Sequence, residues 1–428
     1  MDNPHQFTVF EHHSLVIGRV YGKNTFTEQH HKLLENFYKE KNFPFYSLIR
    51  HGVRFCSYVG VLQIGPLTIE VLPKADQARE DEQAKGQWRD LLIGMLQAVG
   101  VFNIQAPSSS SLKLQANSIL DLYLALYLKE LEYLLHRGLV KRYRKIAGNT
   151  TALKGSLQFS KHIQQNLVHQ ERFYVRYTTY DAQHLIHGIL YKALRLVRQI
   201  NTKAAMQSSI GALLLNFPEM PDLQVTEATF EKITHSRKDE HYQKALAIAR
   251  LLLLNYHPDV SKGRNHVLAL MFDMNLLWEQ FVYATLRQEF RKRNLHHTLS
   301  AQSPKYFWQP TIGSSSKMKP DIVINHDKEH CLLLDTKWKN LSGANPSPED
   351  LRQMYVYHEY FAADKVMLVY PGEQDAEVAG HYLDRITAKK TSKECSVLTI
   401  ANKPNLKAWQ AAIAEKIILV HNRLSMAE

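Results

Sequence analysis

The sequence has little cysteine and no long apolar run. Only 3 cysteines occur in 428 residues, and they are scattered along the chain, so a disulfide framework or a cysteine-rich zinc site is excluded. No uninterrupted apolar run approaches the ~18 residues that a membrane span requires. The N-terminus lacks a basic segment followed by an apolar core, which argues against a signal peptide. We therefore expect a cytoplasmic protein with no transmembrane helix and no membrane partner.

A nucleotide-binding signature is also missing. The segment 18–24 superficially resembles a phosphate-binding loop, but it has one residue too few between its glycines and ends in Asn24. A Ser or Thr at that position would be needed to bind the Mg²⁺ of a nucleotide. The sequence therefore predicts that this chain does not hydrolyse nucleotides itself.

Acidic residues are in the minority. The chain has 41 Asp and Glu against 53 Lys and Arg, which gives a formal net charge of +12. A basic balance favours a polyanionic partner such as nucleic acid. Ribosome-associated and membrane-surface proteins share this balance, so charge alone does not select the partner.

The hydrophobic pattern changes along the chain. Two apolar runs, 58–64 and 67–72, flank a Gly-Pro turn and predict a β-hairpin. From Trp88 onward the apolar period changes from two to about 3.6, which is typical of helices. We therefore predict an α+β multidomain fold with a β-rich region at 1–87, a mainly helical region at 88–265 and an α/β region at 266–428.

The α/β region has a recognisable order of elements. We expect a helix over 268–291, then a hairpin, then a helix over 350–361 and a buried apolar strand at 365–370. The hairpin is built from short β-favouring runs at 322–324 and 331–334. The polar residues between them supply the turn.

Two carboxylates and a lysine are placed together by this hairpin. If its turn is centred on Lys328, Asp321 faces Asp335 across the two strands, with Cβ atoms ~5 Å apart. Side chains two apart on a strand share a face, so Lys337 joins them. By the same alternation we expect Thr336 to point the other way.

These residue types suit metal-dependent phosphodiester hydrolysis. Two buried carboxylates that face each other remain ionised together only if a cation sits between them. Oxygen ligands select a hard ion such as Mg²⁺, which can activate a bound water as the nucleophile. Lys337 would orient that water and offset charge on the phosphate. The Pro-Asp and Asp-x-Lys pattern resembles the PD-(D/E)xK nucleases, although a solvated Asp–Lys pair on a surface hairpin is an alternative.

Neighbouring elements add further candidates. Glu279 on the preceding helix is either a third carboxylate of the site or a structural residue at the exposed helix edge. Gln353 and Tyr357 lie four apart on the following helix and share a face. They resemble a Gln-x-x-x-Tyr element of some PD-(D/E)xK branches. The aromatic segment 306–308 either stacks on nucleobases or is buried against a helix.

Longer motifs extend the resemblance to a specific family. Residues 58–74, 130–143 and 153–157, together with the Asp321, Asp335 and Lys337 core, resemble McrC, the nuclease subunit of McrBC modification-dependent restriction systems. The resemblance implies a PD-(D/E)xK nuclease domain at 266–428, Mg²⁺ as cofactor and double-stranded DNA as substrate. It also implies a hexameric McrB-like AAA+ GTPase partner that senses modified cytosine, bound and stimulated through the region 1–87.

Two other functions stay open at this point. The chain could be a non-catalytic activator or adaptor of an AAA+ ring, but the intact Asp321, Asp335 and Lys337 argue against that interpretation. It could also be a stand-alone DNA repair nuclease. The extended N-terminal region argues against that second alternative, because a nuclease core alone does not need it.

Overall fold

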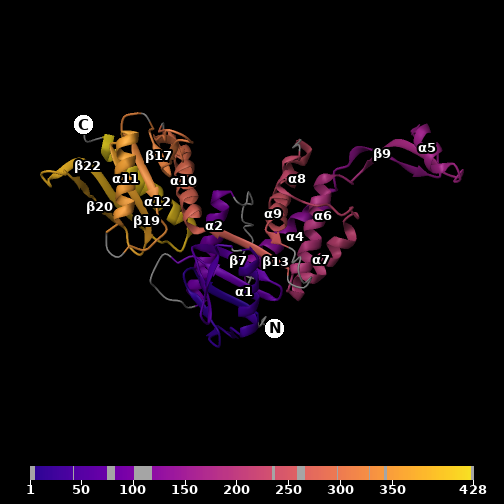
Figure 1. Cartoon of the computed structure of the whole chain (residues 1–428), viewed down its shortest axis with the longest axis horizontal. Helices are drawn as coiled ribbons and strands as arrows, with labels where there is room; N and C mark the ends of the chain where they lie inside the picture. Colours follow the sequence, from indigo (N-terminus) through magenta and orange to yellow (C-terminus); the bar gives the residue numbers. More distant parts are fainter. Residues whose placement is uncertain are drawn as a thin grey trace. The chain divides into compact units, whose positions relative to one another are not determined.

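The structure is a computed structural model. It describes residues 5–41, 43–74, 82–100, 118–233, 237–257, 266–295, 297–326, 328–341 and 345–425. Contacts divide the chain into two compact units (Figure 1). The first unit joins residues 1–106 to residues 259–428, and the second comprises residues 107–258. In the described parts of both units, no helix is long and apolar enough to cross a membrane.

The first unit contains a sheet in the order β1, β8, β7 and β13. These strands are β1 (Gln6–Phe10), β8 (Leu67–Leu72), β7 (Tyr58–Ile64) and β13 (Val267–Asp273). The predicted hairpin over 58–72 is confirmed, because β7 and β8 pair antiparallel from Ile64 opposite Leu67. The predicted helical start at 268 is wrong, since 268–273 form strand. A short continuous apolar run fits either element, and here pairing with β7 decides it.

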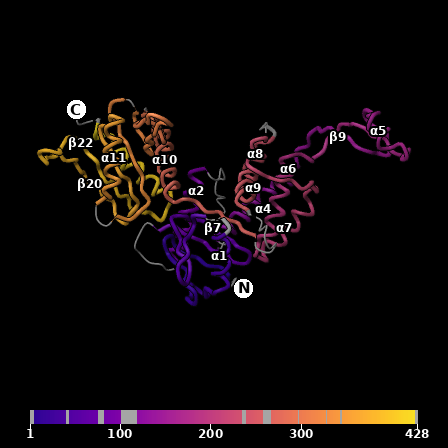
Figure 2. Tube along the Cα trace, viewed as in Figure 1, coloured from indigo at the N-terminus to yellow at the C-terminus, as the bar shows by residue number. Residues whose placement is uncertain are grey.

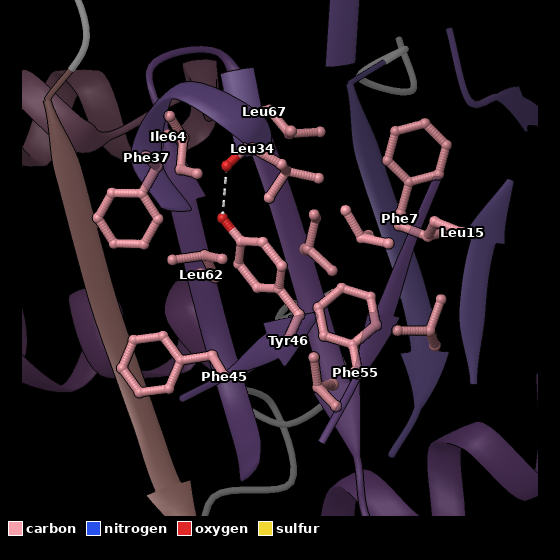
Figure 3. Close-up of a cluster of buried hydrophobic side chains, with 14 of the residues drawn as sticks. Phe7, Leu15, Leu34, Phe37, Phe45, Tyr46, Phe55, Leu62, Ile64 and Leu67 are labelled. Atoms are coloured by element: carbon pink, nitrogen blue, oxygen red, sulfur yellow. Dashed lines mark hydrogen bonds between the residues drawn. The ribbon is translucent and has the colours of Figure 1, made fainter. Parts of the chain in front are cut away.

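Smaller elements complete the N-terminal part. Their bounds are β2 (Ser14–Val16), β3 (Val20–Tyr21), β4 (Asn24–Thr25), α1 (Glu28–Lys41), β5 (Tyr46–Ile49) and β6 (Gly52–Phe55). The β-rich region expected at 1–87 therefore also contains a helix, α1, which the apolar pattern did not predict. In Figure 3 the Tyr46 hydroxyl donates a 2.8 Å hydrogen bond to the Leu34 carbonyl of α1, inside an aromatic and aliphatic core. This bond gives the buried Tyr46 hydroxyl a hydrogen-bond acceptor.

Three helices pack together beside this sheet. They are α2 (Glu82–Val99), α10 (Met274–Lys292) and α12 (Leu406–Ser425), and α2 contacts both others. A Cβ on Gly94 of α2 would approach the Leu406 side chain to 2.7 Å, so glycine allows this close packing. α10 and α12 in turn cover the second large sheet of the unit.

The second large sheet has the order β14, β17, β18, β19, β22 and β20, with β21 paired to β22. Its strands are β14 (Leu299–Ala301), β17 (Ile322–Ile324), β18 (Leu332–Thr336), β19 (Lys365–Gly372), β20 (Ala376–Val378), β21 (His381–Leu383) and β22 (Lys390–Ala401). β18, β19 and β22 run parallel, and β19 is buried along its length, as its continuous apolar sequence predicts.

Helices cover this sheet and a separate hairpin precedes β17. α11 (Pro348–Phe361) contacts β18, β19 and β22, and α10 and α12 also pack on the sheet (Figure 1). The predicted helix at 350–361 is confirmed, and it begins two residues earlier because Pro348 occupies its first turn. Strands β15 (Lys305–Trp308) and β16 (Ser316–Met318) pair with each other only among the described strands.

The second unit is mainly helical. Its elements are α4 (Ile119–Arg137), α6 (Leu185–Ile200), α7 (Ala204–Asn216), α8 (Glu227–Glu231), η1 (Arg237–Tyr242), α9 (Gln243–Leu254) and the short β12 (Tyr256–His257). Ser118 caps α4, because its Oγ accepts from the backbone N–H of Asp121 at 3.2 Å. α6 ends at its C-cap, Asn201, and α7 begins three residues later.

An arm extends from these helices. We define the arm as residues 142–181, with β9 (Arg142–Thr150), β10 (Ser156–Leu157), α5 (Phe159–Asn166) and β11 (Phe173–Asp181). The trace in Figure 2 follows β9 away from α6 to α5. Seven apolar side chains of the arm are more than half exposed: Tyr143, Leu153, Phe159, Ile163, Leu167, Val168 and Tyr180.

Candidate functional site

The β17–β18 hairpin carries the predicted carboxylates. Ile322 pairs with Leu334 and Ile324 with Leu332, so the predicted register about Lys328 is confirmed. Extended by one residue, this register sets Asp321 opposite Asp335. Both strands are buried in the sheet, so the carboxylates stand on a rigid support rather than on a surface loop.

Asp335 and Lys337 form a close charged pair on the candidate site. Asp335 is 1% exposed, and Lys337 Nζ lies 2.8 Å from its Oδ2. Burial and the nearby Asp321 charge raise the pKa of Asp335 to about 7, although Lys337 opposes this. Burial disfavours the Lys337 ammonium, but Asp335 and other carboxylates outweigh it and raise the pKa of Lys337. The Lys337 ammonium therefore remains charged beside the Asp335 carboxyl group, which is partly protonated near pH 7.

Thr336 takes part in the site, which corrects the expectation that it points away. Its backbone N–H and its hydroxyl both donate to Asp321 Oδ2, at 2.7 and 2.8 Å. Alternation failed here because Asp321 precedes β17 and its side chain turns toward the end of β18. Burial raises the pKa of Asp321, while the Thr336 bonds and Lys337 act in the opposite direction. Both bonds engage Oδ2 and hold the carboxylate in one orientation.

Gln353 lies beside the lysine, so the structure brings this predicted residue into the group. Lys337 Nζ donates to Gln353 Oε1 at 3.3 Å, and Gln353 Nε2 donates to the Tyr357 hydroxyl at 2.9 Å. The Tyr357 hydroxyl donates to the Lys319 carbonyl at 3.1 Å. A continuous hydrogen-bond chain therefore runs from Lys337 through α11 to the backbone two residues before Asp321.

Asp350 is a member of this group that sequence reasoning missed. Its Oδ1 lies 3.8 Å from Lys337 Nζ, and Lys339 Nζ donates to its Oδ2 at 2.5 Å. Burial alone would raise the pKa of Asp350, but the bonds from Lys339 and Ser347 lower it. The available signal was the two-residue spacing of Lys337 and Lys339 just after β18, a pair of cations that one acidic side chain can contact.

Glu279 is linked to the site without bonding to its other predicted members. Gln302 Nε2 donates to Glu279 Oε1 at 2.8 Å. Burial raises the pKa of Glu279, and the Asp321 charge raises it further. Within the described residues, no group of three or more His, Cys, Asp or Glu side chains is arranged to hold a metal ion. A third carboxylate ligand at Glu279 therefore stays a prediction.

The two carboxylates nevertheless fit Mg²⁺. Mg²⁺ commonly binds proteins through one or two carboxylates and keeps several waters. Asp335 is buried next to Asp321, and this burial and repulsion raise its pKa to about 7. A cation between them would remove that repulsion and restore ionisation. The donor set therefore suits a hard cation held by Asp321 and Asp335.

The aromatic segment 306–308 is exposed, so burial against a helix does not account for it. Tyr306, Phe307 and Trp308 lie on β15, and Lys317 Nζ of β16 lies 4.7 Å from the centre of the Tyr306 ring. This hairpin ends three residues before Asp321.

This chain is similar to chains of two solved assemblies from Thermococcus gammatolerans. A chain of the Thermococcus gammatolerans half-complex of McrB AAA+ hexamers with bound McrC matches with a TM-score of 0.71 at 18% identity, over 97% of this chain and all of that chain. A chain of the Thermococcus gammatolerans McrBC complex matches at 18% identity over 67% of this chain and 88% of that chain, with a TM-score of 0.48. No protein of curated function matches. The first of these structures establishes a common fold.

The family itself is identified from sequence. Residues 53–371 match the family described as McrBC 5-methylcytosine restriction system component. The match includes the first-sheet hairpin, the arm, Asp321, Asp335, Lys337 and Gln353. Because it covers most of the 428 residues, the chain belongs to the McrBC 5-methylcytosine restriction system component family.

Proposed function

We propose that this chain is the Mg²⁺-dependent DNA endonuclease subunit of a McrBC-like restriction system, with a PD-(D/E)xK core in the residues 266–428. The observation that carries the proposal is the buried Asp335, opposite Asp321 and 2.8 Å from Lys337. Membership of a 5-methylcytosine restriction family supports DNA as the substrate, as does the net charge of +12.

Each residue has a definable task in such a reaction. Asp321 and Asp335 would hold Mg²⁺, which supplies Lewis-acid polarisation of the phosphate and lowers the pKa of a bound water. Thr336 fixes the Asp321 carboxylate through two hydrogen bonds. Lys337 provides N–H donors and positive charge next to the carboxylates, where negative charge develops on the phosphate. Gln353 restrains the Lys337 ammonium from the side of α11.

The test of the nuclease assignment is cleavage of methylated duplex DNA with Mg²⁺ and the partner ring. Asp335→Ala combined with Lys337→Ala should reduce the rate by ~100-fold or more, because a metal ligand and the cation are removed. The fold should persist, since the change relieves repulsion of Asp321. Cleavage at the wild-type rate by the double variant would favour the non-catalytic adaptor alternative.

We also infer that the partner is a hexameric McrB-like AAA+ GTPase that senses modified cytosine. The similar solved chain comes from an assembly of McrB AAA+ hexamers with McrC, and this sequence lacks a phosphate-binding loop. The predicted docking region at 1–87 is one candidate contact. The arm is a second, because its many exposed apolar side chains are typical of a protein interaction surface.

Point substitutions separate the two candidate contacts. A deletion of residues 1–87 would remove β7, the strand that pairs with β13, so lost stimulation could reflect unfolding. We would therefore compare Val20→Asp in the first unit with Phe159→Ser combined with Leu167→Ser in the arm. Leu215→Ser on α7 is the matched control, because Leu215 is exposed but outside the arm. The readout is GTP turnover by the partner, and the variant that loses stimulation identifies the docking surface.

A further inference from the structure

We propose that the hairpin of β15 and β16, residues 305–318, is a DNA-contacting element that stacks its aromatic side chains on nucleobases close to the cleaved bond. We call it the aromatic hairpin. The inference rests on the proposed nuclease function and assigns a task to residues outside the carboxylate site. Tyr306, Trp308 and Lys317 carry it.

The aromatic side chains of this hairpin are presented to solvent. Tyr306 is 61% exposed and Trp308 is 57% exposed, with Phe307 between them also exposed. Large aromatic side chains lose favourable burial when they remain in water, so three in succession are unusual for a strand that serves only packing. They line a hollow of about 670 Å³ together with Lys317. A hollow of this size and composition admits a flat ring system such as a nucleobase.

The charge of the hairpin matches a nucleic acid. From Lys305 to Lys319 the sequence has three lysines and no acidic residue. Lys317 Nζ lies 4.7 Å from the Tyr306 ring centre, which places a cation beside the candidate stacking surface. Bases offer π-faces and the backbone offers phosphates, so one strand of DNA satisfies both features. A protein partner would have to supply both acidic and apolar groups at the same spacing.

The base of the hairpin is fixed to the candidate site. Met318 at the end of β16 is buried. The Tyr360 hydroxyl donates to the Phe307 carbonyl at 3.4 Å, and the Tyr357 hydroxyl donates to the Lys319 carbonyl at 3.1 Å. Both tyrosines belong to α11, the helix that carries Gln353. The hairpin and the lysine are therefore supported by the same helix.

Position along the chain limits where the contact occurs. Asp321 follows Met318 by three positions, and an extended chain spans at most ~3.6 Å per residue. The base of the hairpin therefore lies within ~11 Å of Asp321. Successive nucleotides of a duplex strand rise ~3.4 Å, so we expect the stacked bases within a few nucleotides of the cleaved phosphate.

Tryptophan fluorescence gives a direct test. The chain has 5 tryptophans, and Trp88, Trp278, Trp338 and Trp409 are each 6% exposed or less. A neutral quencher such as acrylamide therefore acts mainly on Trp308. The difference between wild type and Trp308→Phe isolates its signal. The experiment uses the full-length chain without Mg²⁺, so that a short methylated duplex or single strand is bound and not cut.

Variants distinguish stacking from charge. Tyr306→Ala should weaken binding ~10-fold and leave its salt dependence unchanged, because it removes stacking. Lys317→Ala should reduce the slope of log affinity against log salt by about one phosphate contact. Ile386→Ala, a highly exposed apolar residue outside the hairpin, is the matched control and should bind as wild type. Protection of Trp308 by DNA together with these three results supports the proposal.

Other outcomes are equally decisive. If DNA binds and Trp308 remains fully quenchable, the aromatic hairpin is not a DNA contact, although the nuclease assignment is unaffected. If the partner ring protects Trp308 and DNA does not, the hairpin is a protein-docking surface and the proposal is wrong. If the wild-type chain neither binds nor cuts DNA even with the partner, the proposed nuclease function is wrong, and the proposal for the aromatic hairpin is wrong with it.

Discussion

Trp338 donates a 2.6 Å hydrogen bond from its indole Nε1 to Glu11 Oε1, although 327 positions separate the two residues. Glu11 follows β1, and the Lys74 backbone N–H donates to the same oxygen at 2.9 Å. Trp338 directly follows Lys337 and packs its ring against Trp278. The N-terminal sheet is therefore bonded to the residue next to the candidate catalytic lysine. Both partners are buried, so water does not replace the bond easily.

The Glu11–Trp338 bond should contribute to stability. We predict that Glu11→Ala lowers the unfolding free energy by about 1–3 kcal/mol, because the buried Trp338 indole N–H and the half-buried Lys74 N–H lose their acceptor. Glu11→Gln should lose less, since an amide oxygen still accepts from Trp338 and Lys74. Denaturant unfolding measures the difference. Glu35→Ala on α1 is the control, because its carboxylate forms an exposed pair with Lys39 and its removal should leave stability close to that of the wild type.

Stability should also fall with rising pH through Glu11. Burial raises the pKa of Glu11 from 4.5 to about 7. The folded state therefore keeps a proton that the unfolded state releases, so this contribution is complete below about pH 4.5 and is lost as pH rises through about 7. Glu11→Gln should flatten the decline between those values, by at most about 3 kcal/mol. If stability declined equally with pH in the wild type and in Glu11→Gln, the prediction would be wrong. The pKa of Asp335 is also raised to about 7, but this residue is present in both proteins and cancels in the comparison.

Cleavage should depend on pH and Mg²⁺ together. The pKa of Asp335 is raised to about 7, and a proton competes with the cation for this carboxylate. At low Mg²⁺ we expect the cleavage rate to increase as pH rises through about 7. Higher Mg²⁺ should move this midpoint to lower pH, because bound cation stabilises the ionised form. Initial rates with the partner, measured over a grid of pH and Mg²⁺, provide the check. A midpoint independent of Mg²⁺ would argue against Asp335 as a ligand.

Gln353 should affect the reaction through Lys337. We predict that Gln353→Ala reduces cleavage by ~10–100-fold, as expected for residues that orient a site, while the melting temperature changes little. Arg352→Ala, on the same helix but exposed, is the matched control and should cleave normally. Gln353→Glu adds a second test, since a carboxylate still accepts from Lys337. Equal rates for Gln353→Ala and the control would remove Gln353 from the site.

The isolated chain should be nearly inert on duplex DNA with Mg²⁺. One PD-(D/E)xK site cuts one strand, so a double-strand break requires two sites brought together, which the partner assembly would provide. The assay compares nicking and linearisation of a methylated plasmid with and without the partner ring and GTP. Rapid linearisation of unmethylated plasmid by the isolated chain would support the repair-nuclease alternative instead.

Local patterns predicted the elements whose determinants are local. Short β-favouring apolar runs and a turn about Lys328 were enough for the Asp321–Asp335 register. The helix expected over 350–361 was found to within its first turn, which Ser347 caps. Thr336 was misjudged because strand alternation does not govern Asp321, which lies outside β17. β13 was misjudged for a different reason: its apolar run suits helix or strand, and only pairing with a distant strand distinguishes them.

Long-range polar contacts could not be predicted in the same way. Asp350 on α11 contacts Lys337 and Lys339, which follow β18. The acceptor of the Trp338 indole N–H is Glu11, which is 327 positions away in the sequence. Such pairs form only when elements that are distant in the sequence pack side by side. Hydrophobic periodicity and residue propensities do not encode that packing.

The pairing of β13 with β7 sets an order of events during synthesis. Val267 pairs opposite Ile64, so the ribosome must translate some two hundred intervening residues before the edge of β7 receives its neighbour. Until then the nascent chain has an apolar strand with unpaired N–H and C=O groups, a state that favours association with other chains. The second unit, encoded between these strands, has time to fold first. Translation that stops before residue 267 would therefore yield fragments that aggregate through β7.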